Sequence, residues 1–237
     1  MGGWWQSAWL ERDEPKAHPM PHRTVLIAGA TGLVGQQLLK GLLADSGVHQ
    51  VHCLGRRPLP LQHARLTAHI VDFAALPPLP ACDEVYLALG TTIKVAGSQR
   101  AFRAVDHDAN LAVATAARRA GARRAGLVSA MGASAVSPVF YNRVKGELEA
   151  ALGRLGFDGL VIARPSLLVG DRAALGQPVR TGEHIGFALG RALGFLIPAN
   201  YQPIDAARVA AALLAQVPQA SGLRLLLSGE MQHSMAR

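Results

Sequence analysis

The stretch Thr24–Gly35, TVLIAGATGLVG, constrains the fold of this chain more than any other. Four apolar residues run into three glycines, spaced Gly29-x-x-Gly32-x-x-Gly35, and the run LLKGLLAD follows shortly after. This order predicts a buried strand, a tight turn and the start of a helix. Gly29 permits the sharp turn, Gly32 permits close approach of backbone N–H groups to a phosphate, and Gly35 permits close helix–sheet packing. The stretch therefore predicts a dinucleotide site at the N-terminus of that helix.

The rest of the chain alternates strand-like and helix-like patterns, which predicts a doubly wound α/β domain. Further strands are expected at 50–54, 68–71, 84–89, 125–129, 159–164 and 223–227, and helices at 98–120, 139–155, 183–197 and 203–217. The predicted fold is a mostly parallel Rossmann sheet of about seven strands, with helices on both faces and a small C-terminal extension on the substrate side. The strand order should reverse near the first strand, which places the ligand cleft above the glycine turn.

The two ends of the chain differ in composition. Residues 1–22 hold all three tryptophans and show no periodicity, so we predict a disordered tail there; docking of the tryptophans on a partner or on the domain is the alternative. Residues 23–237 are expected to form a single NAD(P)-binding domain, in which 165–205 contribute elements of the substrate cleft. Within 183–197 an apolar helix is expected to cover that cleft or to pack on another subunit.

Composition and charge limit the remaining function classes. The formal charge is +8, but the arginines occur as scattered pairs without a recognition motif, which disfavours a nucleic-acid partner. Because the chain has no run of about 18 apolar residues and no secretory signal, we expect no transmembrane helix and a cytoplasmic location. Cys53 and Cys82 are interpreted as small buried hydrophobic residues rather than a disulfide. We expect no metal site, and either a monomer or a homodimer.

The residues after the second strand indicate which dinucleotide is bound. An NAD site places an aspartate or glutamate there, about twenty residues beyond the glycine turn, to accept a hydrogen bond from the ribose 2′-hydroxyl. Here Gly55 takes that place and Arg56 and Arg57 follow. Because guanidinium groups bind a 2′-phosphate that a carboxylate would repel, the sequence favours NADP(H) over NAD(H). The alternative is a solvated basic turn.

Other strand ends are expected to line the same cofactor. Asp72 and Phe73 would meet the adenine. The small residues of the segment 90–92 would let the chain pass beside the nicotinamide ribose, or would simply form the exit from the fourth strand. The segment that begins at Arg164, where Pro165 ends the sixth strand, would border the nicotinamide or would simply form the turn after that strand. The predicted cofactor-binding set is Gly29, Thr31, Gly32, Leu33, Val34, Gly35, Arg56, Arg57, Asp72, Phe73, Leu89, Gly90, Thr91, Lys145, Arg164 and Pro165.

A second group of residues has the spacing of a reactive site. Tyr141 and Lys145 are four apart in the helix expected at 139–155, so both can point at one ligand. Ser129 ends the strand at 125–129, at the edge where open α/β sheets bind ligands. Asp106 and Asn110 share one face of the helix expected at 98–120. On the helix at 139–155 we further expect Leu148 and Leu152 to face the core, and Glu147 and Glu149 to face solvent.

Taken together, four motifs resemble the short-chain dehydrogenase/reductase superfamily: GATGLVG at 29–35, the strand-end Ser129, YNRVK at Tyr141–Lys145, and RPSLLVG at 164–170. The resemblance runs from Thr24 to about Leu227 and looks most like atypical members of the Tat-interacting-protein oxidoreductase group. It implies that Tyr141 is the general acid/base, that Lys145 stabilises its phenolate and holds the ribose hydroxyls, and that Ser129 polarises the substrate oxygen. It also implies that Asn110 supports a proton-relay water.

One departure from the family pattern concerns the substrate-side hydroxyl. Ala130 stands where related sequences often carry a second serine. The role of polarising the substrate oxygen is therefore open between Ser129, Ser134 and Ser137.

Three functions follow as hypotheses. The first is an NADP(H)-dependent oxidoreductase that transfers hydride between the nicotinamide and a small, apolar carbonyl or alcohol. The second is a non-catalytic protein that binds NADPH as a regulatory or redox-sensing ligand, so the sequence leaves open whether the site turns over. The third, a sugar-nucleotide epimerase or dehydratase, is disfavoured because only about 70 residues follow Pro165.

Overall fold

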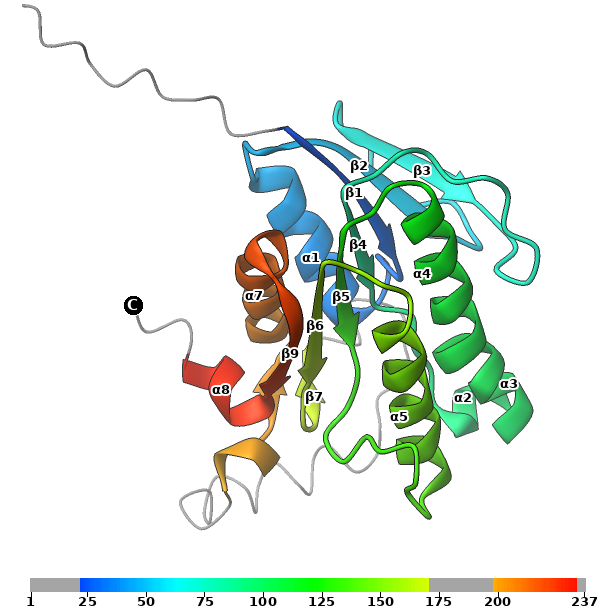
Figure 1. Cartoon of the computed structure of the whole chain (residues 1–237), viewed down its shortest axis with the longest axis vertical. Coiled ribbons are helices and arrows are strands. Elements are labelled where there is room, and N and C mark those ends of the chain that lie inside the picture. The colour runs from blue at the N-terminus through cyan, green and yellow to red at the C-terminus, as the bar shows by residue number, and fades with distance from the viewer. Residues whose placement is uncertain (1–21, 171–197, 234–237) are drawn as a thin grey trace, which may run out of the picture.

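The computed structural model describes residues 22–170 and 198–233. Its main feature is a seven-stranded sheet in the order β3-β2-β1-β4-β5-β6-β9, with every neighbouring pair parallel (Figure 1). The order reverses between β1 and β4, as predicted, so the fold is a doubly wound α/β sheet of the Rossmann type. The strands are β1 (Arg23–Ala28), β2 (Val48–Gly55), β3 (Leu66–Ile70), β4 (Glu84–Leu87), β5 (Arg124–Val128), β6 (Gly159–Arg164) and β9 (Gly222–Leu227).

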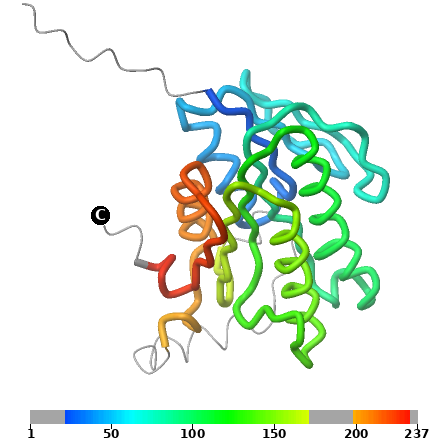
Figure 2. Tube along the Cα trace, viewed as in Figure 1, coloured from blue at the N-terminus to red at the C-terminus, as the bar shows by residue number. Residues whose placement is uncertain are grey.

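Helices cover both faces of the sheet. On one face α1 (Leu33–Ala44) packs against α7 (Ala206–Gln216), and on the other α4 (Asn110–Arg119) packs against α5 (Phe140–Gly153). Figure 2 shows that segments far apart in the chain lie side by side, because α7, from the last quarter of the chain, packs beside α1 of the first βα unit. All the connections from strand to helix leave one edge of the sheet, and that edge carries the site described below.

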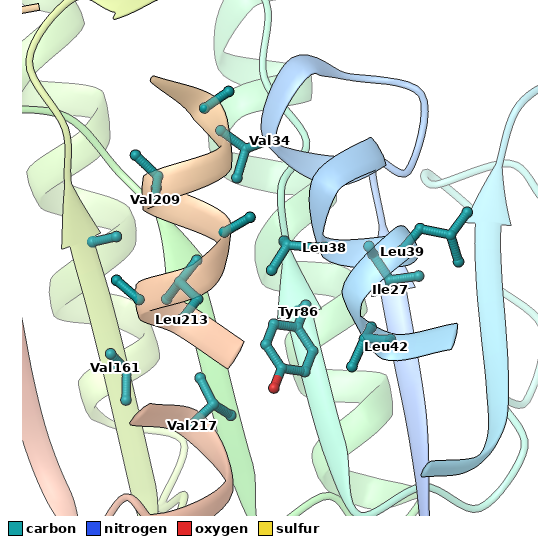
Figure 3. Close-up of a cluster of buried hydrophobic side chains, with 14 of the residues drawn as sticks. Ile27, Val34, Leu38, Leu39, Leu42, Tyr86, Val161, Val209, Leu213 and Val217 are labelled. Atoms are coloured by element: carbon teal, nitrogen blue, oxygen red, sulfur yellow. The ribbon is translucent and has the colours of Figure 1, made fainter. Parts of the chain in front are cut away.

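The residues of β1 show why this arrangement forms. Val25 and Ile27 face α1 and α7, whereas Leu26 and Ala28 face α4 and α5, and all four are fully buried. A parallel strand that is covered on both faces is expected to be continuously apolar, which explains the run read from the sequence. Figure 3 shows the first of these cores, where side chains of α1 and α7 meet above the sheet around the ring of Tyr86.

The helix expected at 98–120 is divided into three parts. Ser98 caps the short helix α3 (Gln99–Arg103), since its hydroxyl accepts from the Ala101 N–H at 3.1 Å. A π-helical segment, η1 (Ala104–Ala109), follows and then α4. A separate turn of helix, α2 (Ile93–Ala96), precedes them. The periodicity of apolar residues could not reveal the π-helical segment, because six residues are too few to separate a wider turn from an ordinary one.

The C-terminal part holds elements that the sequence did not predict. A second small sheet pairs β7 (Leu168–Val169) with β8 (Ile204–Asp205), and short helices η3 (Ala199–Tyr201), η4 (Val217–Gln219) and α8 (Ser228–His233) accompany it. Helix α7 begins at Ala206 because the Asp205 carboxylate accepts from the Ala207 N–H at 2.8 Å, as an N-cap does. The tail predicted at 1–22 and the helix predicted at 183–197 lie outside the described residues, His22 excepted.

Two further expectations concern the cysteines and the membrane. Cys53 and Cys82 are both free and buried, and burial raises their pKa values to about 12 and about 11. They act as apolar packing residues, as predicted. Among the described helices, none combines the length and the apolar character that crossing a membrane requires.

Candidate functional site

The strand ends bring the predicted site residues to one edge of the sheet. The glycine turn follows β1, Arg56 and Arg57 follow β2, Asp72 follows β3, and the segment 89–91 follows β4. Ser129 follows β5, and the run from Arg164 ends β6 and continues beyond it. Because the strands are parallel, all of these residues lie at the carboxyl edge, where doubly wound sheets bind their ligands.

The fold requires glycine at two of the three positions of the first turn. Gly29 has φ +96°, and a Cβ there would lie 2.4 Å from the Ala88 carbonyl oxygen; a Cβ at Gly35 would lie 2.0 Å from the Gly29 carbonyl oxygen. The fold itself therefore demands glycine at these two positions. Gly32 is different, because its φ is −82° and its Cβ would meet the nearest atom at an ordinary 3.4 Å.

The turn at Gly32 has the features of a helix N-terminus that can bind an anion. Gly32 is the N-cap of α1, no side chain caps this helix, and its first turn has no acidic residue. The N–H groups of that turn are thus left without a side-chain acceptor, and the helix dipole favours an anion there. Thr31 is exposed beside the turn, whereas Val34 is buried in the core, so Val34 can offer a ligand only its backbone. A pyrophosphate is the group that this cradle suits.

The end of β2 carries two cations and no carboxylate. Arg56 and Arg57 are exposed directly after Gly55. The Val71 N–H donates to the Gly55 carbonyl at 2.9 Å, which holds the end of β3 beside this turn. Asp72 is exposed and its carboxylate accepts from the Ala74 N–H at 2.9 Å, while the Phe73 ring packs against the core under α4. The part of the site that can meet the adenosine half of a dinucleotide is formed by Arg56, Arg57, Asp72 and Phe73.

A buried ion pair between α5 and the π-helical segment lies beside the loop that follows β4. The Lys145 ammonium lies 2.7 Å from Oδ1 of Asp106, and only 5% and 1% of the two side chains are exposed. Oδ2 of Asp106 accepts from the Thr91 N–H at 2.8 Å. Burial lowers the pKa of Lys145, but Asp106 and then Tyr141 raise it by more, so the pKa lies above the ordinary 10.5. Burial raises the pKa of Asp106, an effect that the ammonium opposes. Lys145 therefore carries its positive charge at neutral pH.

Tyr141 lies one turn before Lys145 on α5. It is half-buried, and its ring lies 5.4 Å from the ring of the buried Phe102 on α3, measured between centroids. This contact fixes the side of α5 on which the phenol stands. Tyr141 and Lys145 both lie within α5 and are four apart, the spacing that puts two side chains on one face of a helix.

Asn110 is buried at the start of α4 and connects β4 to the π-helical segment. Its Nδ2 donates to the carbonyl oxygens of Leu89 at 3.1 Å, Val105 at 3.3 Å and Asp106 at 3.2 Å. Its Oδ1 is buried and has no hydrogen-bond partner within the described part of the chain. Buried acceptors are nearly always satisfied, so this oxygen is suited to accept from a water or a ligand.

Ser129 and Arg164 meet on a third residue, Glu149 of α5. The Ser129 hydroxyl donates to Oε1 of Glu149, the Arg164 Nε donates to the same oxygen at 3.1 Å, and the Arg164 Nη2 pairs with Oε2. The hydrogen bond to Glu149 raises the pKa of Arg164. We expected Glu149 to face solvent, and that expectation is wrong: it is buried. Tyr141, Lys145 and Glu149 are spaced by four, so they share a face, and this spacing is the signal that could have identified it.

The other two candidate serines are placed differently. Ser137 accepts from the Val139 N–H at 3.2 Å in the turn before α5. The Ser134 hydroxyl has no hydrogen bond to another described residue, and its backbone packs against Gly146, where a Cβ would come within 2.2 Å of it. Ser134 is thus held beside the residue that follows Lys145. The Pro165 carbonyl accepts from the Met131 N–H at 2.9 Å, which joins the loops after β5 and β6.

The N–H groups and positive charges of the site suit an organic anion. Within residues 22–170 and 198–233, no three histidine, cysteine, aspartate or glutamate side chains gather as a metal site requires. The phosphate cradle, the two exposed arginines and the charged Lys145 can instead hold phosphates and ribose hydroxyls. The residues present therefore fit a dinucleotide.

Comparison with known proteins supports this fit. A family model described as NAD(P)H-binding matches residues 29–156, which contain the glycine turn, Asp106, Tyr141 and Lys145. Among solved structures, the Bordetella bronchiseptica enzyme WbmH in complex with NAD+ has the same fold, with a TM-score of 0.64 and 17% identity over 88% of this chain and 76% of that one.

Two curated relatives are more similar in sequence. Protein HTATIP2 of Rattus norvegicus is 36% identical over 171 residues, which is 69% of this chain and 69% of the relative. Protein FMP52, mitochondrial, of Candida albicans is 33% identical over 195 residues, 78% of this chain and 84% of the relative. Further fungal relatives are also named as mitochondrial proteins, and this overturns the cytoplasmic location that we predicted from the sequence. The chain belongs to the NAD(P)H-binding family, as an atypical short-chain dehydrogenase/reductase similar to Protein HTATIP2.

Proposed function

We propose that this protein is an NADP(H)-dependent oxidoreductase that acts on a small, apolar carbonyl or alcohol. The observation that carries the proposal is the position of Tyr141 one turn from the charged, buried Lys145, at the same sheet edge as the phosphate cradle. A phenol next to a fixed cation can release its proton and take it back, because the cation stabilises the phenolate.

The residues divide the reaction between them. Bound NADPH would supply a hydride to the carbonyl carbon. The Tyr141 hydroxyl gives its proton to the carbonyl oxygen, which completes the alcohol, and Lys145 stabilises the phenolate that remains. Asn110 would hold a water that returns a proton, a role supported by its buried Oδ1, which has no hydrogen-bond partner among residues 22–170 and 198–233. In alcohol oxidation the same residues act in reverse.

Ser129, Ser134 and Ser137 are the three candidates for the substrate-side hydroxyl. Ser137 accepts from the Val139 N–H, a bond that does not use its own hydrogen. The single hydrogen of Ser129 points to Glu149, so Ser129 can polarise a substrate oxygen only by giving up that bond. The Ser134 hydroxyl keeps its hydrogen free of other described residues. The exposed Val136 and Val139 of the same loop give the approach to Tyr141 an apolar character, which favours an apolar substrate.

The preference for NADP(H) is tested first. In an Arg56→Ala/Arg57→Ala variant we expect NADPH affinity to fall by about 10–100-fold and NADH affinity to stay unchanged, because the guanidinium groups would bind only the 2′-phosphate. The measurement is a pair of fluorescence titrations with NADPH and NADH, on the wild type and the variant.

A control variant removes the same charge elsewhere. Arg119→Ala/Arg154→Ala takes two exposed arginines from the C-terminal ends of α4 and α5, away from the cofactor edge. It should keep the wild-type preference. Equal binding of NADPH and NADH by the wild type would show that Arg56 and Arg57 form only a solvated turn.

A second prediction separates binding from folding at the glycine turn. Gly32→Ala should leave the melting temperature close to that of the wild type, since its Cβ meets no protein atom closer than 3.4 Å. NADPH affinity should nevertheless fall by about tenfold or more, because the methyl group occupies the space of the pyrophosphate. Gly153→Ala, where a Cβ meets nothing within 4 Å, is the neutral control. Unchanged NADPH binding by Gly32→Ala would place the nucleotide elsewhere.

A further inference from the structure

The pair formed by Asp106 and Lys145 carries an inference beyond the proposed function. A Cβ at Gly90 would lie 3.5 Å from Oδ1 of Asp106 and 3.9 Å from Nζ of Lys145. Gly90 is exposed, so the buried pair lies directly under the surface at the end of β4. An atom at the position of that Cβ would therefore be in van der Waals contact with both charged groups.

The π-helical segment and Asn110 place Asp106 there. Asn110 donates to the carbonyl oxygens of Val105 and Asp106 and to that of Leu89, so it ties the π-helical turn to the end of β4. The Thr91 N–H then fixes Oδ2 of Asp106 at 2.8 Å, which directs Oδ1 toward Lys145. Single π-helical turns are often found at functional sites. Here the turn orients the Asp106 carboxylate toward Lys145 of α5.

The Asp106 carboxylate holds the Lys145 ammonium but uses only part of its hydrogen-bonding capacity. An ammonium has three N–H groups. In the described part of the chain, the Lys145 ammonium has a hydrogen-bonding partner in Asp106 alone. We propose that Asp106 is the positioning residue of the site, which fixes the Lys145 ammonium beside Gly90 with its remaining N–H groups free for the ribose hydroxyls of a bound nucleotide. This inference rests on the proposed function, since it assumes that a nucleotide occupies that space.

The alternative is that the pair only stabilises the fold. The groups that face the ammonium are Asp106 from the π-helical segment and Tyr141 and Glu149 from its own helix; the end of β4 presents the Thr91 N–H and no titratable side chain. Without Asp106, burial would act on Lys145 with less opposition and would lower its pKa. A structural role alone does not require nucleotide binding to follow this change.

The test compares Asp106→Asn with Asp108→Asn. Asp108 lies in the same π-helical segment but is exposed, so its variant loses the same charge away from Lys145. The chain has only four lysines, Lys16, Lys40, Lys94 and Lys145, so ¹³C labelling of lysine follows Lys145 by NMR without cofactor or substrate. We expect the pKa of Lys145 to lie above its ordinary value in the wild type and in Asp108→Asn, and to be lower in Asp106→Asn than in either.

Fluorescence titration with NADPH between pH 7 and about 9.5 supplies the second readout. Wild-type affinity should be constant over this range, whereas Asp106→Asn should bind about tenfold more weakly at pH 7 and lose further affinity as Lys145 deprotonates. Asp106→Glu, which keeps the carboxylate, should restore the flat pH profile. A melting curve for each variant confirms that it is folded.

The outcomes separate the inference from the function on which it rests. If Lys145 titrates in Asp106→Asn as in the wild type, or if its titration moves while NADPH binding does not, the positioning role is overturned. If the wild type binds no NADPH although Lys145 titrates as expected, the proposed function is overturned and the hold of Asp106 on the ammonium is supported.

Discussion

Replacing Tyr141 with phenylalanine should reduce the rate of carbonyl reduction by about 10²–10⁴-fold, the usual contribution of a general acid, while NADPH binds with wild-type affinity. The substitution removes only the hydroxyl group. The ring keeps its contact with Phe102, and Lys145 keeps its ion pair with Asp106, so the fold and the cofactor site should be unaffected. The measurement is NADPH oxidation with a panel of small apolar aldehydes and ketones, together with an NADPH titration of the same protein.

Tyr86→Phe is the matched control. Tyr86 lies on β4 in the core beside α1 and α7, and its hydroxyl donates to Glu84 at the opposite end of that strand from the Lys145 ion pair. The Tyr86→Phe variant should react at the wild-type rate. A Tyr141→Phe variant as active as the wild type would remove Tyr141 from the chemistry.

The same experiment decides between an enzyme and a binding protein. If the wild type binds NADPH but reduces no member of the panel, and Tyr141→Phe behaves identically in every assay, the non-catalytic alternative is favoured. Because cofactor affinity and turnover are measured on the same two proteins, a loss of binding cannot be mistaken for a loss of chemistry.

The sheet could be predicted from the sequence because its signals are local. The buried strands are short apolar runs, and the turn after β1 has glycines that clash with the backbone if they are replaced. Once the strands are parallel, every strand end falls at one edge, so the prediction that Arg56, Asp72 and Ser129 lie at that edge follows from topology alone. Their roles toward a ligand remain predictions.

The contacts within the site could not be predicted because they join distant residues. Helical periodicity showed that Asp106 and Asn110 share a face, but not that this face meets α5 and places Asp106 against Lys145. The π-helical turn, which aims Asp106, leaves no local signal. Glu149 was assigned to solvent because it is charged; only the approach of Arg164 from β6 and Ser129 from β5 makes its burial possible.

The cluster around Glu149 should contribute more to stability than the partly exposed ion pair of Glu147 on the same helix. In Glu149→Ala, Arg164 loses its partner and the buried Ser129 hydroxyl loses its acceptor. Removal of one partner of a buried pair costs about 3 kcal/mol of unfolding free energy. For a domain of this size that loss lowers the melting temperature by about 6–12 °C, which calorimetry would detect.

Glu147→Ala provides the comparison, because Glu147 lies on the same helix two residues earlier. It is half-buried and pairs with Arg103, whose side chain is 41% exposed, so its loss should cost no more than about 1 kcal/mol. A Glu149→Leu/Arg164→Met double variant should lose less stability than Glu149→Ala, since it removes both charges and fills the space with apolar atoms. If Glu149→Ala and Glu147→Ala melt at the same temperature, the cluster does not anchor α5. In that case the position of Tyr141 and Lys145 must depend on the Phe102 contact and the Asp106 pair instead.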